Sequence, residues 1–166
     1  FNPVSQWIVY SDSCVVPDNK PSNVDLVGIG NLLGSNCRKN LESTNWLMVG
    51  CGAIGCEMLK NLAKLNLTTN GGKLFVTDPD HIEKSNLSRQ FLFRNSHIGK
   101  PKSKTAINSI YQMNNNMNLV AMFDKVSNDN QQFIDELAPE LFGVINALDN
   151  IDARRYMDEQ CFRYGK

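Results

Sequence analysis

Apolar and polar positions along the chain follow two periods, one typical of strands and one typical of helices. Short apolar runs bounded by glycine or polar residues predict buried strands at 46–49, 74–76, 119–126 and 142–148. Apolar positions spaced three and four residues apart predict helices at 31–44, 56–67, 104–113, 128–137 and 151–164. This alternation predicts an α/β fold, a Rossmann-like, doubly wound, mostly parallel sheet with helices on both faces.

The first 30 residues do not share this pattern. A short aromatic stretch from Trp7 to Tyr10 is followed by turn-forming residues, among them Pro17 and Pro21. We therefore expect an N-terminal arm or linker over residues 1–30. Residues 31–166 are long enough for one domain with its own hydrophobic core.

Charge and cysteine content argue against several classes of protein. The chain has 17 basic and 17 acidic residues, which argues against a nucleic-acid or anionic-membrane partner. No apolar run approaches the ~18 residues that a membrane-spanning helix needs. The five cysteines are odd in number and lack C-x-x-C spacing, as expected of reduced thiols rather than a zinc site. We expect a protein of the cytoplasm, the nucleus or both.

A glycine-rich segment follows the first predicted strand. Gly50, Gly52 and Gly55 fit the pattern G-x-G-x-x-G between a strand and a helix. Such glycines allow a tight turn and let the backbone approach a phosphate at the positive end of the helix. A glycine-rich turn without a ligand is the alternative. Asp78 ends the second strand, where a carboxylate can accept hydrogen bonds from ribose hydroxyls, so NAD and ATP fit equally well at this stage.

The polar residues after Asp78 favour ATP. A triphosphate calls for fixed cations, because it carries more charge than a dinucleotide pyrophosphate; arginine supplies a planar fork and lysine a point charge. Arg89 and Lys102 suit these two tasks, whereas Lys100 and Lys104 fit a solvated helix start equally well. The other polar side chains of this stretch include Asp80, Glu83, Asn86 and Gln90.

A second carboxylate, Asp149, ends the fourth predicted strand. Open α/β sheets bind ligands at this edge, and Mg²⁺ prefers one or two carboxylates together with phosphate oxygens and water. The alternative is that Asp149 or Asn150 caps the helix that begins near Ile151. If Asn150 is the cap, Asp149 remains available for the metal.

Several of these segments together resemble a known family. Residues 49–61, 76–80, 82–94, 100–103 and 146–154 closely resemble the active adenylation half of ubiquitin-activating enzymes, which belongs to a wider group with the MoeB and ThiF enzymes. The similarity runs in order from about Trp46 to the end of the chain. A weaker similarity, over residues 2–7, is to the segment that precedes this half in the single-chain enzymes.

The resemblance implies an ATP- and Mg²⁺-dependent adenylation of the C-terminal carboxylate of ubiquitin, before thioester transfer to a cysteine. Arg89 and Lys102 would then stabilise the charge that grows on the phosphates. Asp149 would bind Mg²⁺. The nucleotide would be bound by Gly50, Gly52, Ala53, Gly55, Asp78, Asp80, Asn86, Arg89, Gln90, Lys102, Asp149 and Asn150.

The resemblance also implies that the chain is part of a longer enzyme. None of the five cysteines matches the family's acceptor cysteine, which lies in a later segment. We expect the isolated chain to be inactive, because the family uses an inactive adenylation half that lends residues to the site. The implied partners are that half, ubiquitin or a ubiquitin-like modifier, and a ubiquitin-conjugating enzyme.

Other functions share part of this pattern. The nearest is a catalytic subunit that activates SUMO or another ubiquitin-like modifier, followed by an enzyme of the MoeB and ThiF type. An NAD-dependent oxidoreductase is disfavoured by Arg89, Lys102 and Asp149. A non-catalytic scaffold is disfavoured because every polar position of the site is retained.

Overall fold

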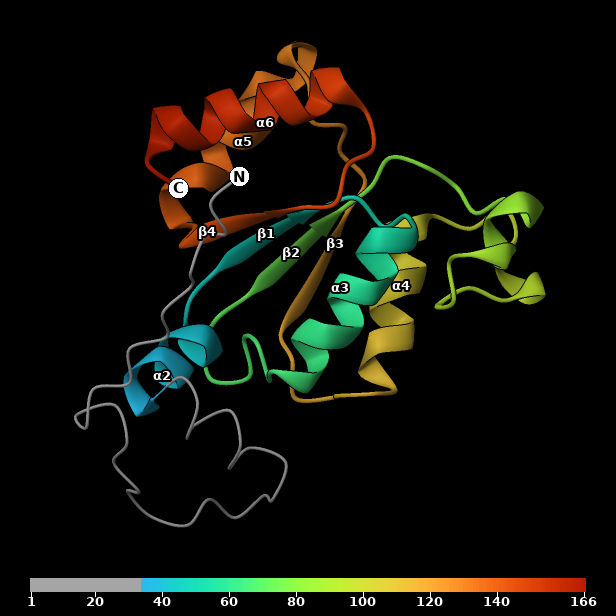
Figure 1. Cartoon of the computed structure of the whole chain (residues 1–166), viewed down its shortest axis with the longest axis horizontal. Helices are drawn as coiled ribbons and strands as arrows, with labels where there is room; N and C mark the ends of the chain where they lie inside the picture. Colours follow the sequence, from blue (N-terminus) through green and yellow to red (C-terminus); the bar gives the residue numbers. More distant parts are fainter. Residues whose placement is uncertain (1–33) are drawn as a thin grey trace, which may run out of the picture. The chain divides into compact units, whose positions relative to one another are not determined.

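Short parallel strands form the centre of the computed structural model, which describes residues 34–166. The predicted arm over residues 1–30 lies outside the described residues. Within them, the sheet has four strands in the order β3-β2-β1-β4, all parallel (Figure 1). The strands are β1 (Trp46–Val49), β2 (Leu74–Thr77), β3 (Leu119–Met122) and β4 (Gly143–Asn146).

Helices cover both faces of this sheet. One face carries α3 (Ala53–Lys64) and α4 (Lys102–Tyr111), and the opposite face carries α5 (Gln131–Leu137) and α6 (Ile151–Tyr164) (Figure 1). Residues Leu41–Lys166 form one compact unit, and α2 (Ser35–Ser43) begins before it. Short 3₁₀ helices are η2 (Lys84–Ser88), η3 (Asn95–His97), η4 (Asn128–Asn130) and η5 (Ala138–Glu140).

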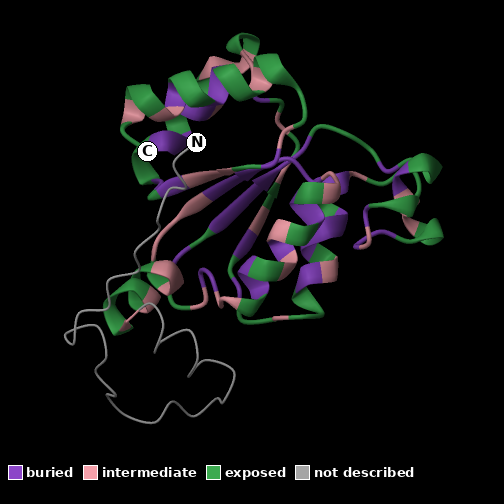
Figure 2. Cartoon of the chain, viewed as in Figure 1, coloured by how far each residue is buried: buried purple, intermediate pink, exposed green. Residues whose placement is uncertain are grey.

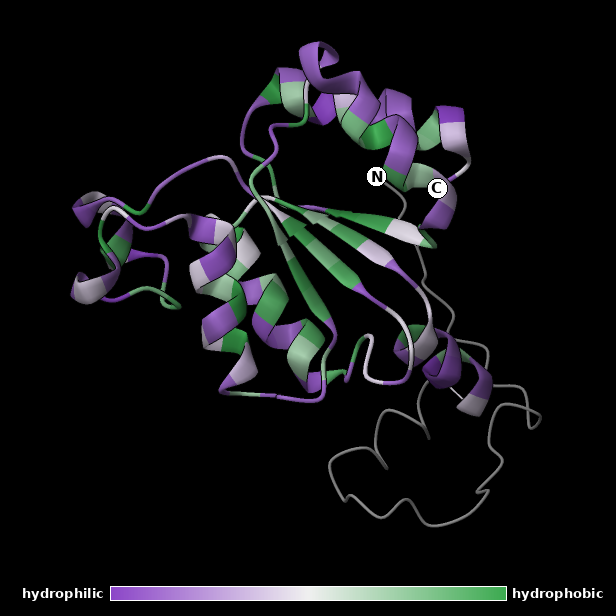
Figure 3. Cartoon of the chain, turned by 180° about the vertical axis from the view of Figure 1, so that it is seen from behind, coloured by the Kyte–Doolittle hydropathy of each residue, from purple (hydrophilic) through white to green (hydrophobic). Residues whose placement is uncertain are grey.

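Alternate strand residues contribute to the two halves of the core. Met48 and Val76 pack with α3 and α4, whereas Leu47, Val49 and Phe75 pack with α5 and α6. Successive side chains of a strand point to opposite faces, so a sheet covered on both sides needs apolar residues at nearly every position. The central strands are accordingly buried and apolar (Figures 2 and 3). The predicted doubly wound fold is confirmed.

Several element boundaries differ from those predicted. Helix α3 begins and ends three residues earlier than the prediction of 56–67. It cannot continue to 67, because Asn66 and Thr68 adopt left-handed φ angles of 56° and 59°. Strand β3 ends at Met122 rather than at 126, and β4 is likewise shorter than 142–148. Helix α4 begins at Lys102 and α5 only at Gln131, after η4. The predictions 46–49 and 151–164 coincide with β1 and α6.

The predicted helix over residues 31–44 corresponds to α2, of which residues 34–43 are within the described part. In that part of the chain, no helix combines the length and the apolar content needed to cross a bilayer. Because all four strands are parallel, their carboxyl ends lie at one edge of the sheet.

Candidate nucleotide site

A cavity of about 1000 Å³ opens at the carboxyl ends of the strands. Parallel α/β sheets bind ligands at this edge, where the loops that follow adjacent strands diverge. The cavity brings together nearly all residues that the sequence suggested for a nucleotide site. They are Gly50, Gly52, Ala53, Asp78, Asp80, Asn86, Arg89, Gln90, Lys102, Asp149 and Asn150.

The three glycines after β1 have different roles. A Cβ at Gly55 would lie 2.2 Å from the carbonyl oxygen of Gly50, so the start of α3 can approach the turn only without a side chain there. Gly50 has a φ of 97°, and a Cβ there would lie 2.8 Å from the backbone oxygen of Ala147. A Cβ at Gly52 would meet no atom within 4 Å. Gly52 thus borders open space, whereas Gly55, contrary to expectation, is a packing residue outside the cavity wall.

Asp78 is tied to the glycine turn. Its Oδ2 accepts a hydrogen bond of 2.6 Å from the backbone N–H of Cys51, and its Oδ1 accepts one of 2.9 Å from the N–H of Asp80. Burial raises the pKa of the Asp78 carboxyl above its ordinary value, and these two hydrogen bonds and the charge of Lys102 act in the opposite direction. The carboxyl group is therefore held in one orientation beside the turn.

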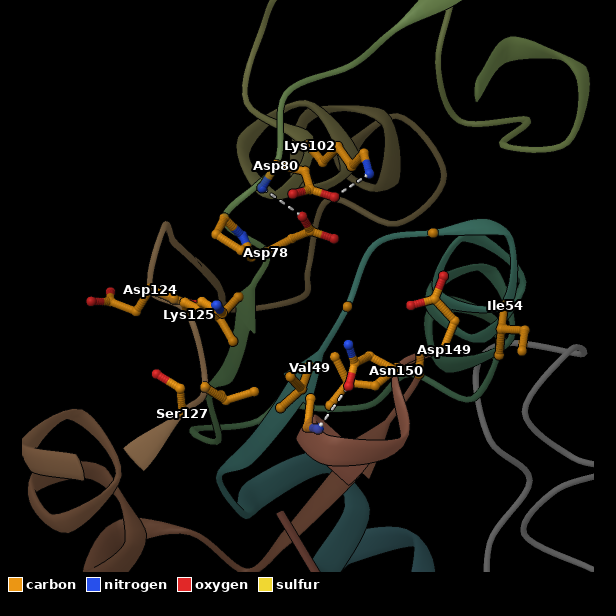
Figure 4. Close-up of a pocket in the computed structure, with 18 of the residues that line it drawn as sticks. Val49, Ile54, Asp78, Asp80, Lys102, Asp124, Lys125, Ser127, Asp149 and Asn150 are labelled. Atoms are coloured by element: carbon orange, nitrogen blue, oxygen red, sulfur yellow. Dashed lines mark hydrogen bonds and ion pairs between the residues drawn. The ribbon is translucent and has the colours of Figure 1, made fainter. Parts of the chain in front are cut away.

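Lys102 is a buried cation on the cavity wall, with 8% of its surface exposed. Its Nζ lies 2.8 Å from Oδ2 of Asp80, and its backbone N–H donates a 2.9 Å hydrogen bond to the carbonyl oxygen of Asp80 (Figure 4). The predicted phosphate-binding lysine is thus paired with a carboxylate in this structure. Because Asp80 also donates to Asp78, one chain of contacts joins the lysine to the glycine turn.

The stretch around η2 supplies three polar side chains. Oδ1 of Asn86 accepts a hydrogen bond of 2.9 Å from the N–H of Glu83, which stabilises the start of η2. The guanidinium of Arg89 is exposed and donates a hydrogen bond of 3.1 Å to the carbonyl of Ser85. Oε1 of Gln90 is buried and has no hydrogen-bond partner. A buried oxygen of this kind requires a donor, which a ligand hydroxyl or a bound water supplies.

The turn after β4 presents Asp149 to solvent. The side chain of Asn150 accepts hydrogen bonds from the N–H groups of Asp152 and Ala153 and is the N-cap of α6, so Asp149 has no part in the cap. In residues 34–166, no group of three or more histidine, cysteine or acidic residues is arranged to hold a metal ion. One exposed carboxylate fits Mg²⁺ that arrives with phosphate oxygens, but not a permanently bound structural metal.

Sequence reasoning missed the loop at 124–128, which forms a wall of the cavity. The apolar run that predicted β3 continued to Val126, but Oγ1 of Thr77 donates a 2.6 Å hydrogen bond to the carbonyl of Asp124 and draws the chain out of the sheet. Figure 4 shows Asp124 and Ser127 across the cavity from Asp149. The only local sign that the strand ends before Val126 was the charged pair at 124–125. Other missed wall residues include Ile54, His81 and Tyr156.

None of the cysteines around the site has the properties of an activated thiol. Burial raises the pKa of the Cys56 thiol to about 11 and that of Cys51 well above its ordinary value. Burial also raises the pKa of Cys161. A reactive cysteine needs a lowered pKa, so these three side chains serve packing rather than nucleophilic attack.

Comparisons with known proteins agree with this geometry. Residues 26–166 match the model of the ThiF family. The chain is 49% identical over 135 residues to ubiquitin-like modifier-activating enzyme 1 of Dictyostelium discoideum, which covers 80% of this chain and 13% of that protein. It is 41% identical over 172 residues to ubiquitin-like modifier-activating enzyme 6 of Homo sapiens, covering 97% of this chain and 16% of that protein.

A solved structure shares the fold. It is the E. coli tRNA N6-threonylcarbamoyladenosine dehydratase TcdA in complex with ATP, with a TM-score of 0.73 at 21% identity. The match covers 85% of this chain and 56% of that one. The chain thus spans only a small part of the two modifier-activating relatives. The family match nevertheless includes every residue of the sheet and of the cavity wall, and the chain belongs to the ThiF family.

Proposed function

We propose that the full-length protein adenylates the C-terminal carboxylate of ubiquitin with ATP and Mg²⁺, as the first step of ubiquitin activation. A thioester to a cysteine outside this chain follows. The names of the two modifier-activating relatives support activation of a ubiquitin-like protein as the general role. The choice of ATP and Mg²⁺ is supported by the chemistry of the cavity.

The observation that carries the proposal is the position of Lys102. Its side chain is only 10% exposed and lies on the wall of a cavity that also contains the glycine turn and Asp78. An anion beside a buried ammonium group offsets the cost of removing it from water, and Asp80 is that anion in this structure. A phosphate group can take the place of this carboxylate at Lys102, and the exposed guanidinium of Arg89 supplies a further cation.

The remaining residues fit the other parts of the nucleotide. Asp78 accepts hydrogen bonds from ribose hydroxyls, and the free N–H groups at the start of α3 point at a phosphate beside Gly52. When bound at Asp149, Mg²⁺ supplies neutralisation of charge on the phosphate oxygens. Arg89 and Lys102 stabilise the same charge as it grows and transfer no proton, so their contribution is positioning and electrostatics.

The test is ATP–pyrophosphate exchange by the full-length protein in the presence of ubiquitin. Arg89→Ala and Lys102→Ala should each slow exchange by about 100-fold or more, the usual effect of removing a charge-stabilising group. Matched controls are Arg163→Ala and Lys64→Ala, which remove exposed cations at the ends of α6 and α3. Exchange at the wild-type rate in both test variants would contradict the assignment of the cavity.

The modifier is tested separately. The full-length protein with ATP and Mg²⁺ is offered ubiquitin, SUMO and other ubiquitin-like proteins, and thiol-sensitive thioesters are identified by gel electrophoresis. A thioester with ubiquitin supports the proposal. A thioester with SUMO but not with ubiquitin replaces the modifier and keeps the chemistry, whereas binding of NAD in place of ATP would overturn the chemistry itself.

A further inference from the structure

Two aromatic rings meet beside the cavity, at the ends of β2 and β3, and have no role in the function described above. The ring centroids of His81 and Phe123 lie 5.1 Å apart with an interplanar angle of 63°, an edge-to-face contact. His81 is part of the cavity wall. Phe123 follows the last residue of β3 and is 48% exposed.

The backbone on either side of the imidazole is held in place. His81 forms an antiparallel bridge with Pro101, immediately before Lys102. The next residue, Ile82, is 1% exposed and donates a hydrogen bond of 2.9 Å to the carbonyl of Lys100. With Phe123 against one side of its ring, the imidazole is braced at the cavity although its residue is exposed. A side chain fixed in this way is preorganised for contact with a ligand.

The groups suited to binding phosphates lie on the segments that follow β1 and β2. The cations Lys102 and Arg89 lie on segments after β2, and the N–H groups of the glycine turn lie at the start of α3. The loop after β3 adds the charged side chains of Asp124 and Lys125 and the apolar side chain of Val126, which is 5% exposed. With the ribose at Asp78 and the phosphates at the cations, the uncharged base of the nucleotide extends toward β3.

We propose that His81, braced by Phe123, forms the outer wall of the base-binding end of the cavity and packs against the purine ring of ATP. This inference rests on the proposed function, because it takes ATP as the ligand. The imidazole contributes a flat π surface to the base, and Val126 contributes a buried apolar side chain to the same cavity. Stacking on an aromatic side chain stabilises any base by about 1–3 kcal/mol. The contact therefore strengthens binding more than it selects one base over another.

The test compares two ligands that differ in the base and ribose. Binding of ATP and of inorganic tripolyphosphate to the full-length protein is measured by titration calorimetry in the presence of Mg²⁺. His81→Ala should raise the Kd for ATP about 5- to 30-fold, in keeping with the loss of one stacking contact. The Kd for tripolyphosphate should change less than about twofold, because that ligand has no base. Phe123→Ala should show the same selectivity with a smaller loss.

Two further variants separate packing from other causes. His81→Tyr keeps a flat ring and should retain most of the affinity for ATP. Met113→Ala is the matched control for Phe123→Ala, because Met113 is also 48% exposed but lies outside the cavity wall. Thermal unfolding monitored by circular dichroism checks that each variant is folded.

The possible outcomes distinguish this inference from the proposed function. If His81→Ala weakens ATP and tripolyphosphate equally, the imidazole acts at the phosphates and the base-wall role is wrong. If ATP binding is unchanged in His81→Ala, His81 makes no contact with the ligand and the inference fails alone. If the wild-type protein binds no ATP, the proposed function itself is overturned, and the inference with it.

Discussion

Two walls of the cavity are built in opposite ways. The wall at the glycine turn consists of backbone atoms and buried side chains, with Gly55 against Gly50 and both oxygens of Asp78 bound by N–H groups. The wall that follows β2 along the chain presents long side chains, with Lys102 held by Asp80 and Arg89 exposed. The first wall includes residues of the hydrophobic core, whereas the second consists largely of polar side chains attached to segments outside it.

This difference between the two walls predicts whether a substitution changes the free energy of unfolding or the affinity for an anion. Changes at the glycine turn should lower the free energy of unfolding, because packed backbone cannot move aside. A change of the exposed cation Arg89 should leave folding intact and weaken anion binding, because surface charges contribute little to stability. Four experiments, described from the largest expected effect to the smallest, can break or sharpen this contrast.

Gly55→Ala should have the largest effect. The added Cβ would lie 2.2 Å from the carbonyl oxygen of Gly50, so α3 or the turn has to shift. We expect the free energy of unfolding to fall by about 3 kcal/mol or more, at the upper end for overpacked sites. Denaturation in urea, followed by circular dichroism, measures it. A loss below about 1 kcal/mol would show that the turn can move and that the two walls differ less than proposed.

Gly52→Ala tests the same turn from the side of the ligand. Its Cβ would point into open space, and the φ of Gly52 is −71°, so alanine is tolerated and stability should change by less than about 1 kcal/mol. The methyl group would occupy the place where a phosphate approaches the backbone, and we expect about tenfold weaker ATP binding, a loss of ~1.4 kcal/mol. Calorimetric titration with ATP decides. Unchanged affinity would mean that phosphate does not approach this backbone.

Asn150→Ala concerns the exposed start of α6, where backbone N–H groups are bound by a side chain. The substitution removes the two hydrogen bonds that the Asn150 side chain accepts, so we expect the free energy of unfolding to fall by about 1 kcal/mol. The control is Asn108→Ala, an exposed asparagine inside α4, where alanine is the better helix former. Equal melting temperatures for the two variants would indicate that another group takes over the cap.

The smallest signal is expected from thiol labelling. The pKa of Cys56 is raised to about 11, so at pH 8 only about one thiol in a thousand is the reactive thiolate, and this fraction rises as the pH approaches 11. Cys51 is also buried, with a pKa raised well above its ordinary value. In the folded protein at pH 8, iodoacetamide should therefore modify exposed Cys37 well before either thiol, as mass spectrometry can show. Rapid native labelling of Cys56 would mean that water reaches the first wall.

Local sequence signals predicted the ordered elements well. Strand β1 coincides with its apolar run, and α6 lies between the cap Asn150 and Gly165, whose φ of 64° ends the helix. The end of β3 was missed, because the hydrogen bond from Thr77 to Asp124 joins residues far apart in the chain and leaves no local pattern. Propensity predicts where an element can form, whereas such long-range contacts decide where it stops.

The same distinction applies to the site. Motif spacing indicated Asp78, Lys102 and Asp149, and all three line one cavity. The contact between His81 and Phe123 depends on the pairing of β2 with β3, which the spacing of residues does not reveal. Gly55 belonged to the motif, but its role is to let α3 approach the turn rather than to border the cavity.

The ion pair between Lys102 and Asp80 has a consequence for how an anion enters. A phosphate that reaches this ammonium group takes the place of a carboxylate already bound to it, so the site exchanges one anion for another. The ammonium group of Lys102 therefore has an anion beside it both before and after the exchange. The side chain of Asp80 is 65% exposed, so water can solvate its carboxylate once it is released. Such a site selects among anions by their affinity for Lys102, because an anion that binds the ammonium group more weakly than Asp80 does cannot displace this carboxylate.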